Sequence, residues 1–270
     1  MHPRGAGDGS MSGRIAAVLG AFRVEDDALG PAEIARRTGL PRSTVHRLAH
    51  ELVGTGLLEH AGGRVRLGLR LFEIGQRVPR QRVLREAALP LMSDLREATR
   101  QTVHLAVLEG HEVVYVEILP TAGGPALPSS VGGRLPALAT GVGKAILACS
   151  PPPLAEELLA AGLPRLTGRA VSAPALMARE LARIRRDGVA YDREESGAGI
   201  VCVACPVLDT EGLAVGALSV SGWSGRMRTG QVAPAVRTAA LTLSRTLAGG
   251  DAAPIRMIRL QHPHRLPPVV

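Results

Sequence analysis

Aromatic side chains and lysine are both nearly absent from this chain of 270 residues. Phe, Trp and Tyr make up 2% of the residues, and Lys144 is the one lysine, so arginine supplies 31 of the 32 basic side chains. Proteins that bind single-stranded nucleic acid stack its bases on aromatic rings, so this composition disfavours a single-strand-binding protein. Binding to duplex DNA relies on phosphates and groove edges and needs no rings. The net charge of +8 therefore permits a duplex-DNA partner.

Cysteine is also scarce, and long apolar runs are missing. Cys149, Cys202 and Cys205 are the three cysteines, an odd number that is unlike the disulfide framework of a small secreted protein. Segment 1–12 lacks the apolar core of a signal peptide, and no run reaches the roughly 18 uncharged apolar residues of a membrane span. We therefore expect a cytoplasmic protein without membrane contact. Hydrophobic residues make up 46% of the chain, enough for a packed core.

Periodicity and composition divide the chain into two domains with a tail at each end. Residues 1–11 are Gly-rich and residues 251–270 carry four prolines without a periodic apolar face, so both are expected to be flexible tails. Residues 12–78 show helical patterns followed by a short hairpin, whereas residues 80–249 begin with a helix and then mix strands with helices. Half of the net charge lies in the first 80 residues, which hold 12 basic and 8 acidic side chains.

Residues 31–52 have the pattern of a helix-turn-helix motif. The first helix is predicted to begin at Pro31, a residue favoured at the first helical position, and to stop at Gly39. In the second helix, apolar residues at i, i+3, i+4 and i+7 form one face. Arginine can pair with guanine or phosphate, and serine and threonine hydroxyls reach phosphates or bases. The polar side chains predicted to bind DNA are Arg42, Ser43, Thr44, His46 and Arg47.

A two-stranded hairpin is predicted directly after this motif. Residues 57–60 and 64–68 alternate in polarity around a turn at 61–63. A hairpin that follows a helix-turn-helix is a wing, and Arg64 and Arg66 would lie along the phosphate backbone. The alternative is that these charges form the solvent-exposed face of an ordinary helical bundle. The order of turn, polar helix face and basic hairpin favours DNA binding.

The second domain is predicted to be of the α+β class, with a largely antiparallel sheet. A helix over 80–88 is followed by Pro90, which marks a break or kink before a further helix, and these helices are expected to link the domains and to contribute to a dimer. Strands are predicted at 103–108, 113–118, 200–208 and 213–220. Helices are predicted near 142–149, 153–161, 174–187 and 231–247.

Three blocks of sequence resemble the IclR family of bacterial transcription regulators. They are GLPRSTVHRL at 39–48, VGGRLP with ATGVGKA at 131–145, and GVAYDREE with GIVCVACPV at 188–207. The resemblance covers roughly 12–249 and implies a winged helix-turn-helix, a linker helix and a GAF-like effector-binding domain, assembled as a homodimer or homotetramer. The family usually has an aromatic residue in the wing where this chain has Val65, so the packing of the wing is expected to differ.

The same resemblance implies an effector pocket in the second domain. Its six matching positions are Gly141, Val142, Asp192, Cys202, Ser219 and Ser221. The residues themselves suit a small-molecule site, because Thr140 and Gly141 open a helix whose free N–H groups can receive a carboxylate. Ser219 and Ser221 share one face of a strand. The expected effector is a small organic molecule such as a carboxylic acid or an aromatic metabolite.

Other interpretations of these motifs lack the residues that they need. A phosphate-binding loop requires Gly and Ser or Thr where this chain has Leu138 and Ala145. Cys202 and Cys205 lie three apart in a strand and would point to opposite faces. His46 and His50 have helical ligand spacing but no further ligands beside them. We therefore expect no metal site and no cofactor.

The sequence thus predicts a ligand-responsive transcriptional repressor that is not an enzyme. Its first domain would bind double-stranded operator DNA and its second a small effector. The alternative is a GAF-type small-molecule sensor or enzyme whose N-terminal domain mediates protein contacts. An enzyme would need a nucleophile with a base, but Gly-x-Ser-x-Gly is absent around Ser219, Ser221 and Ser224, and His104 and His111 have no obvious partners.

Overall fold

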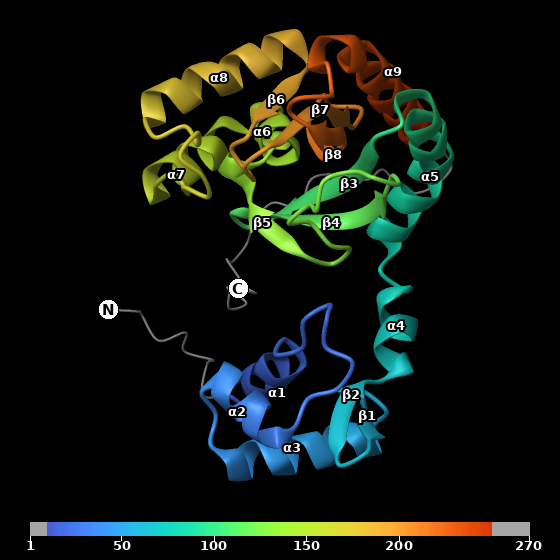
Figure 1. Ribbon diagram of the computed structural model, residues 1–270, viewed down its shortest axis with the longest axis vertical. Helices are drawn as coiled ribbons and strands as arrows, with labels where there is room; N and C mark the ends of the chain where they lie inside the picture. The colour runs from blue at the N-terminus through green and yellow to red at the C-terminus, as the bar shows by residue number, and fades with distance from the viewer. Residues whose placement is uncertain (1–9, 250–270) are drawn as a thin grey trace. The chain divides into compact units, whose positions relative to one another are not determined.

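The computed structural model describes residues 10–249, which form two compact units divided between Pro79 and Arg80 (Figure 1). The tail predicted at 251–270 lies outside the described residues. So does the tail predicted at 1–11, apart from its last two residues, of which Met11 begins the first helix. None of the described helices is both long and apolar enough to cross a membrane.

The first unit contains the predicted helix-turn-helix and hairpin. Its elements are α1 (Met11–Leu19), α2 (Pro31–Thr38), α3 (Arg42–Gly54), β1 (Leu58–Ala61), β2 (Arg64–Leu67) and α4 (Leu69–Gly75). Gly39 ends α2 in the left-handed conformation, with φ of 71°, which glycine adopts without strain and which turns the chain into α3. Ile34, Val45 and Leu48 are buried between the helices. The short helix α4 was not predicted from the sequence.

Val65 occupies the inward position of the wing. Its side chain is buried, and its N–H and carbonyl exchange hydrogen bonds with Leu29 at 2.9 and 2.8 Å. Gly62 and Gly63 both have positive φ at the tip, as a two-residue hairpin turn requires. The valine therefore packs into the core of this unit at a position where the family usually has a ring.

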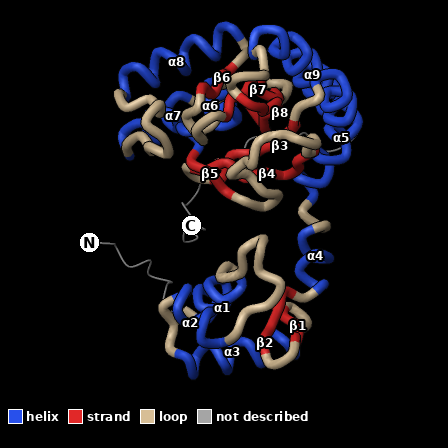
Figure 2. Tube along the Cα trace, viewed as in Figure 1, coloured by secondary structure: helices blue, strands red, loops and turns tan. Residues whose placement is uncertain are grey.

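The second unit is built on one six-stranded antiparallel sheet in the order β5-β4-β3-β8-β7-β6 (Figure 2). Its strands are β3 (Thr102–Glu109), β4 (Glu112–Leu119), β5 (Arg134–Pro136), β6 (Ala190–Arg193), β7 (Ile200–Leu208) and β8 (Ala214–Trp223). The predicted α+β class and antiparallel sheet are confirmed. The short edge strands β5 and β6 were not predicted.

Helices cover both faces of this sheet (Figure 1). The long helices α5 (Pro79–Thr99) and α9 (Thr229–Gly249) pack on one face, and α6 (Gly141–Ala148) lies on the other with α8 (Pro174–Asp187) and α7 (Pro152–Ala161) outside it. A single 3-10 turn (Ala137–Ala139) precedes α6. Cys205 of β7 faces the α5 and α9 side and Cys202 faces α6, so the prediction that they point to opposite faces is confirmed.

The prediction that Pro90 breaks the chain into two helices is wrong, whereas the alternative of a kink stays a prediction. α5 runs through Pro90 as one helix of 21 residues. Its buried residues before and after the proline, among them Leu84, Ala88 and Met92, lie on one continuous face against the sheet. Burial of that face compensates for the hydrogen bond that the proline nitrogen cannot donate.

Candidate functional site

Four neighbouring strands place polar side chains in two rows on the face of the sheet that α6 covers. The strand register pairs the residues of each row directly across the ladder. The first row consists of Thr102, Ser221, Cys202 and Asp192, and the second begins with His104, Ser219 and Ala204. Every one of these residues is buried. Since side chains in a strand alternate between faces, the two-residue spacing of Ser219 and Ser221 puts both hydroxyls on this side.

A bulge in β4 brings Tyr115 to the same face. The β3–β4 register shifts between Leu105 and Ala106, which pair with Glu117 and Tyr115, so that Val116 is an extra residue. Tyr115 therefore packs beside His104, with ring centroids 5.4 Å apart. Glu117 instead receives a hydrogen bond from Arg85 Nε of α5 at 2.6 Å.

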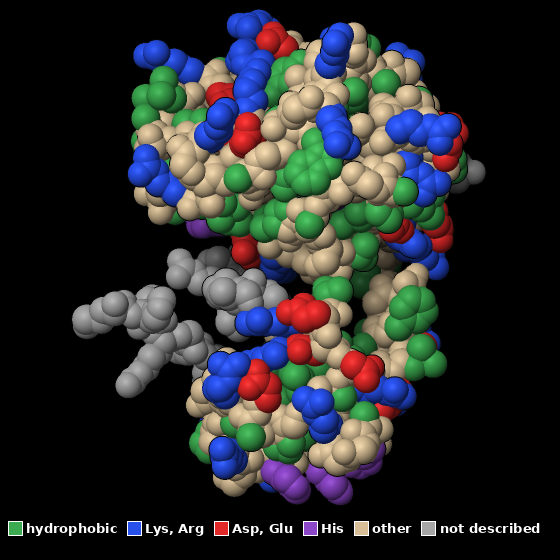
Figure 3. Space-filling view, viewed as in Figure 1, with side chains coloured by type: hydrophobic (Ala, Val, Ile, Leu, Met, Phe, Trp, Pro, Cys, Tyr) green, Lys and Arg blue, Asp and Glu red, His purple; other side chains and the backbone are tan. Residues whose placement is uncertain are grey.

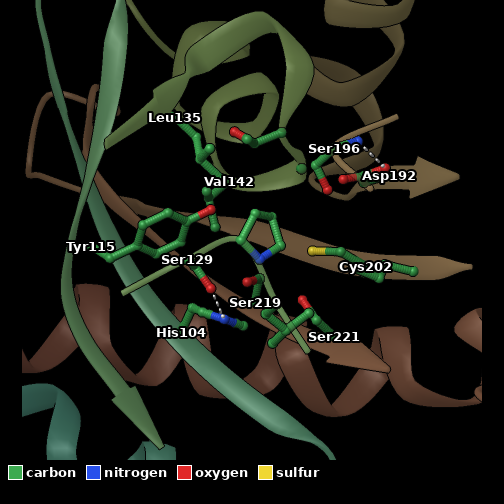
Figure 4. A pocket seen from close by; sticks show the side chains of 15 residues that line it. His104, Tyr115, Ser129, Leu135, Val142, Asp192, Ser196, Cys202, Ser219 and Ser221 are labelled. Carbon is green, nitrogen blue, oxygen red and sulfur yellow. Dashed lines mark hydrogen bonds between the residues drawn. The ribbon is translucent and has the colours of Figure 1, made fainter. Parts of the chain in front are cut away.

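The first turn of α6 and the loop before β5 close over these rows and leave one cavity (Figure 4). It has about 320 Å³ of space not filled by atoms, its opening to solvent included. All six residues predicted for the effector pocket line it. Thr140, which the sequence indicated as the helix entry, also lines it, and the lining residues that the sequence did not indicate are His104, Tyr115, Leu127, Pro128, Ser129, Leu135, Ser196 and Ile200.

The N-terminus of α6 presents backbone donors at this cavity. Thr140 caps the helix, its Oγ1 accepting a hydrogen bond from the N–H of Gly143 at 3.1 Å. Within the described residues, the N–H groups of Gly141 and Val142 have no hydrogen-bond partner. A Cβ at Gly141 would lie only 2.9 Å from Cys202 Sγ, so glycine allows the helix end to approach the sheet. An anion in the cavity can be received by these donors.

Lys144 is a structural ion-pair partner and lies outside the cavity lining. Its side chain is completely buried, and Nζ lies 2.6 Å from Glu195 Oε1 and 3.0 Å from Glu180 Oε1. The second oxygen of Glu195, Oε2, is buried without a hydrogen-bond partner in the described structure. This geometry agrees with the sequence argument against a phosphate-binding loop.

Asp192 connects the cavity to the loop that follows β6. It is only 1% exposed, and its Oδ1 accepts hydrogen bonds from the N–H of Glu195 at 2.7 Å and of Ser196 at 3.4 Å. Burial raises the pKa of Asp192 above its ordinary value, and these hydrogen bonds and the charge of Lys144 offset part of that effect. The group is therefore an acid that titrates at higher pH than an exposed aspartate.

The remaining titratable groups of the cavity are uncharged at neutral pH. Burial lowers the pKa of His104 to about 4, and its Nε2 lies 3.0 Å from Ser129 Oγ. Burial raises the pKa of Cys202 to about 12 and raises the pKa of Tyr115. A thiol held in this state is a poor nucleophile and a poor metal ligand. Among the described residues, no group of three or more His, Cys, Asp or Glu side chains could hold a metal ion.

The predicted DNA-binding side chains lie on the outer face of α3 and on the wing. Arg42, Ser43, His46 and Arg47 are exposed, Thr44 is half-buried, and both wing arginines, Arg64 and Arg66, are exposed. Figure 3 shows histidine side chains gathered where α3 lies.

Two of these arginines already have acidic partners. Arg47 lies 2.7 Å from Glu51, and Arg66 lies 3.1 Å from Glu59. Arg42 and Arg64 make no ion pair with any residue that the structure describes. This surface therefore presents hydrogen-bond donors and positive charge, and two of its four arginines form no ion pair within the described residues.

Two domain profiles match the chain, and together they cover most of it. The profile "Bacterial transcriptional regulator IclR C-terminal" matches residues 76–245, and "IclR helix-turn-helix domain" matches residues 13–62. The chain belongs to the IclR family of bacterial transcriptional regulators. Among curated IclR-family relatives, the HTH-type transcriptional regulator XynR of Escherichia coli is 33% identical over 87% of this chain and 95% of its own. The transcriptional repressor IclR of the same organism is 30% identical over 74% of this chain and 75% of its own.

Solved IclR-family structures have the same fold. An IclR homolog from Microbacterium hydrocarbonoxydans, crystallised in complex with 4-hydroxybenzoate, is 34% identical with a TM-score of 0.82, over 87% of this chain and 98% of its own. The IclR structure from Thermotoga maritima is 27% identical with a TM-score of 0.72, over 87% and 97% of the two chains.

Proposed function

We propose that this IclR-family regulator is a repressor that binds operator DNA through α3 and the β1–β2 wing and changes its affinity when a small organic acid occupies the cavity of the second unit. The observation that carries the proposal is the convergence of the six expected residues from α6, β6, β7 and β8 on one cavity. Polar groups that converge among apolar side chains such as Leu127, Leu135 and Ile200 suit a small-molecule site. A curated relative is named as a repressor, which supports the direction of control.

In this proposal, α3 is the recognition helix. Its first turn presents Arg42, Ser43 and Thr44, and His46 and Arg47 follow on the same exposed side. The wing would place Arg64 and Arg66 along a neighbouring phosphate backbone. Arg47 would exchange its contact with Glu51 for one with DNA, which is inexpensive because exposed ion pairs contribute little to stability.

The effector would be held at two ends of the cavity. Its carboxylate would accept hydrogen bonds from the N–H groups of Gly141 and Val142 and from the hydroxyls of Ser219 and Ser221. Its uncharged body would lie toward Tyr115 and His104. A hydroxylated aromatic acid has this distribution of groups, and the Microbacterium relative was crystallised with 4-hydroxybenzoate.

The active form would be a homodimer, or a homotetramer built from dimers. Helix α4 contains no buried residue, and its side chains Leu69, Phe72 and Ile74 are 65%, 62% and 49% exposed. A second copy of the chain would cover exposed apolar side chains of α4. Two recognition helices would then reach successive major grooves, about 34 Å apart. The effector would alter their spacing through α5 and so couple the two sites. Such a regulator works where the chromosome is, in the cytoplasm.

Gel retardation with the DNA upstream of the protein's own gene tests this proposal. We expect retardation that weakens as salt is raised, and that changes when 4-hydroxybenzoate or a related acid is added. Arg47→Ala is expected to weaken operator binding and to leave ligand binding unchanged. Absence of salt-sensitive retardation would favour the alternative, a small-molecule sensor or enzyme with an N-terminal protein-interaction domain.

A further inference from the structure

No cationic side chain within residues 10–249 lines the cavity to balance an anionic ligand. Among the described residues that line it, Asp192 is the one acid, and there is no lysine or arginine. His104 is neutral because burial lowers its pKa to about 4. The thiol of Cys202 and the phenol of Tyr115 keep their protons at neutral pH because burial raises the pKa of each. A bound anion therefore meets one group that can carry a charge, the carboxyl group of Asp192.

The ammonium group that acts on Asp192 is already neutralised by other acids. Lys144 Nζ lies 2.6 Å from Glu195 and 3.0 Å from Glu180, and its side chain is completely buried. Asp192 is a third carboxyl group near this one ammonium and is joined to Glu195 through the backbone N–H of that residue. Negative groups thus outnumber positive ones here before any ligand binds.

The donors that can receive a ligand carboxylate lie beside Asp192. They are the N–H groups of Gly141 and Val142, which have no partner within the described residues. A Cβ added to Gly141 would lie 3.5 Å from the Cβ of Asp192, which shows how near the helix end and the acid are. In Figure 4, Asp192 and Cys202 lie together on the side of the cavity opposite Tyr115. Two neighbouring carboxylates do not both stay ionised, and one of them holds a proton.

We propose that an anionic effector binds together with one proton, which the carboxyl group of Asp192 takes up from solvent. This inference rests on the proposed function, because it concerns the same cavity. In the complex, the protonated carboxyl donates one hydrogen bond to the ligand carboxylate, and Oδ1 still accepts from the N–H of Glu195 and Ser196. A monocarboxylate with an uncharged body is accommodated in this way. A dianion would need a second proton or a cation and is rejected.

Titration calorimetry of the full chain with 4-hydroxybenzoate tests this proposal. The measurement is repeated in buffers with different ionisation enthalpies between about pH 5.5 and 8.5, which gives the number of protons exchanged. We expect uptake to rise with pH toward about one proton per ligand, and Kd to increase roughly tenfold per pH unit where uptake is complete. The neutral analogue 4-hydroxybenzamide is expected to bind without proton uptake, and the dianion terephthalate is expected not to bind.

A pair of matched variants assigns the proton to one residue. Asp192→Asn keeps an acceptor oxygen for the N–H groups of Glu195 and Ser196 but cannot take up a proton, so it is expected to bind 4-hydroxybenzoate with no uptake and a pH-independent Kd. Asp209→Asn is the control, because Asp209 also accepts two backbone hydrogen bonds, from Glu211 and Leu213 at 2.9 Å, and does not line the cavity. It is expected to retain the full uptake.

Each contrary outcome has a distinct meaning. Zero uptake by the unmodified protein over the whole pH range overturns the proposal without reference to any variant. Uptake that persists in Asp192→Asn also overturns it, since the proton then resides on the ligand or on another group such as Glu195. Failure to bind 4-hydroxybenzoate at any pH, by protein that still retards its operator, overturns the effector class and this inference with it. Failure to retard the operator is a failure of the proposed function instead.

Discussion

The ammonium nitrogen of Lys144 lies 2.6 Å from a carboxylate oxygen of Glu195, and no part of the lysine side chain is exposed. Lys144 belongs to α6, whose N-terminus forms one wall of the cavity. Glu195 belongs to the loop that Asp192 holds in place through two hydrogen bonds. The ion pair therefore ties two separate walls of the cavity together, and Glu180 of α8 joins it from a third element.

Replacement of this lysine should strongly destabilise the second unit. Lys144→Met leaves Glu195 buried without its partner, so we expect a loss of about 3–5 kcal/mol in the free energy of unfolding. Trp223, the single tryptophan, reports denaturant unfolding of this unit by fluorescence. Glu195→Gln in the same variant should recover part of the loss. Arg183→Met, which removes a partly exposed partner of Glu180, should cost less than about 1 kcal/mol. A loss that small for Lys144→Met would contradict the structural role.

Gly143 is expected to tolerate no side chain. A Cβ at this position would overlap the carbonyl oxygen and Cα of Ala137, both rigid backbone atoms. We expect Gly143→Ala to destabilise the unit by about 3 kcal/mol, as overpacking of a rigid site does. The control is Gly230→Ala in α9, where nothing lies within 4 Å of the added Cβ and alanine should stabilise the helix by up to about 1 kcal/mol. Equal unfolding midpoints for the two variants would show that the start of α6 can move.

Elements with local signals were the ones that the sequence could predict. Helix α8 begins at Pro174 and ends before Gly188, and both residues act on their own neighbours whatever the tertiary structure. Helix α4 was missed because it is one of the shortest helices and its apolar side chains face no core formed by residues 10–249. Strand β5 has three residues and depends on its pairing with β4. Pro90 was overinterpreted because the sheet that holds α5 together is distant in sequence.

The residues that line the cavity also divide into those that the sequence predicted and those that it missed. The alternation of β8 predicted that Ser219 and Ser221 share a face, and the resemblance to the IclR family supplied the other expected positions. His104 could not be recognised, because its place depends on the register of β3 against β8. The side of the sheet that Tyr115 faces depends on a bulge at Val116, which no local sequence pattern predicts. The positions of His104 and Tyr115 in the cavity are therefore determined by tertiary structure.

His104 should make the second unit sensitive to acid. Burial lowers its folded-state pKa to about 4 from the ordinary 6.5, so the unfolded state binds the proton first and stability falls as pH drops below that ordinary value. The expected contribution is a loss of about 2.5 kcal/mol between about pH 7.5 and 4.5. His104→Asn should lack this part of the pH dependence in urea unfolding followed by Trp223 fluorescence, whereas His111→Asn, at a partly exposed turn, should keep it. Identical pH dependence for His104→Asn and the unmodified protein would show that the site is not sealed from water.

Arg64 should contribute one phosphate contact to operator binding. It is exposed at the start of β2 and has no ion-pair partner within the described residues, so its charge is available. Arg64→Ala should reduce the slope of log K against log salt by about one, with little change in preference among operator sequences. Arg226→Ala removes the same charge from an exposed position of the second unit and should leave the slope unchanged. A slope that is the same for all three proteins would remove the wing from the proposed interface.

The apolar face of α4 should control self-association. Leu69 and Phe72 are 65% and 62% exposed, and covering each with a second copy would contribute about 1.5–3 kcal/mol. Leu69→Ser combined with Phe72→Ser should therefore raise the dimer dissociation constant at least roughly tenfold in sedimentation velocity and weaken operator retardation in parallel. Val24→Ser is the matched control, since Val24 is 76% exposed in the same unit but lies outside α4. Unchanged sedimentation of the double variant would mean that the copies meet elsewhere, and the operator would then be expected to bind with unaltered affinity.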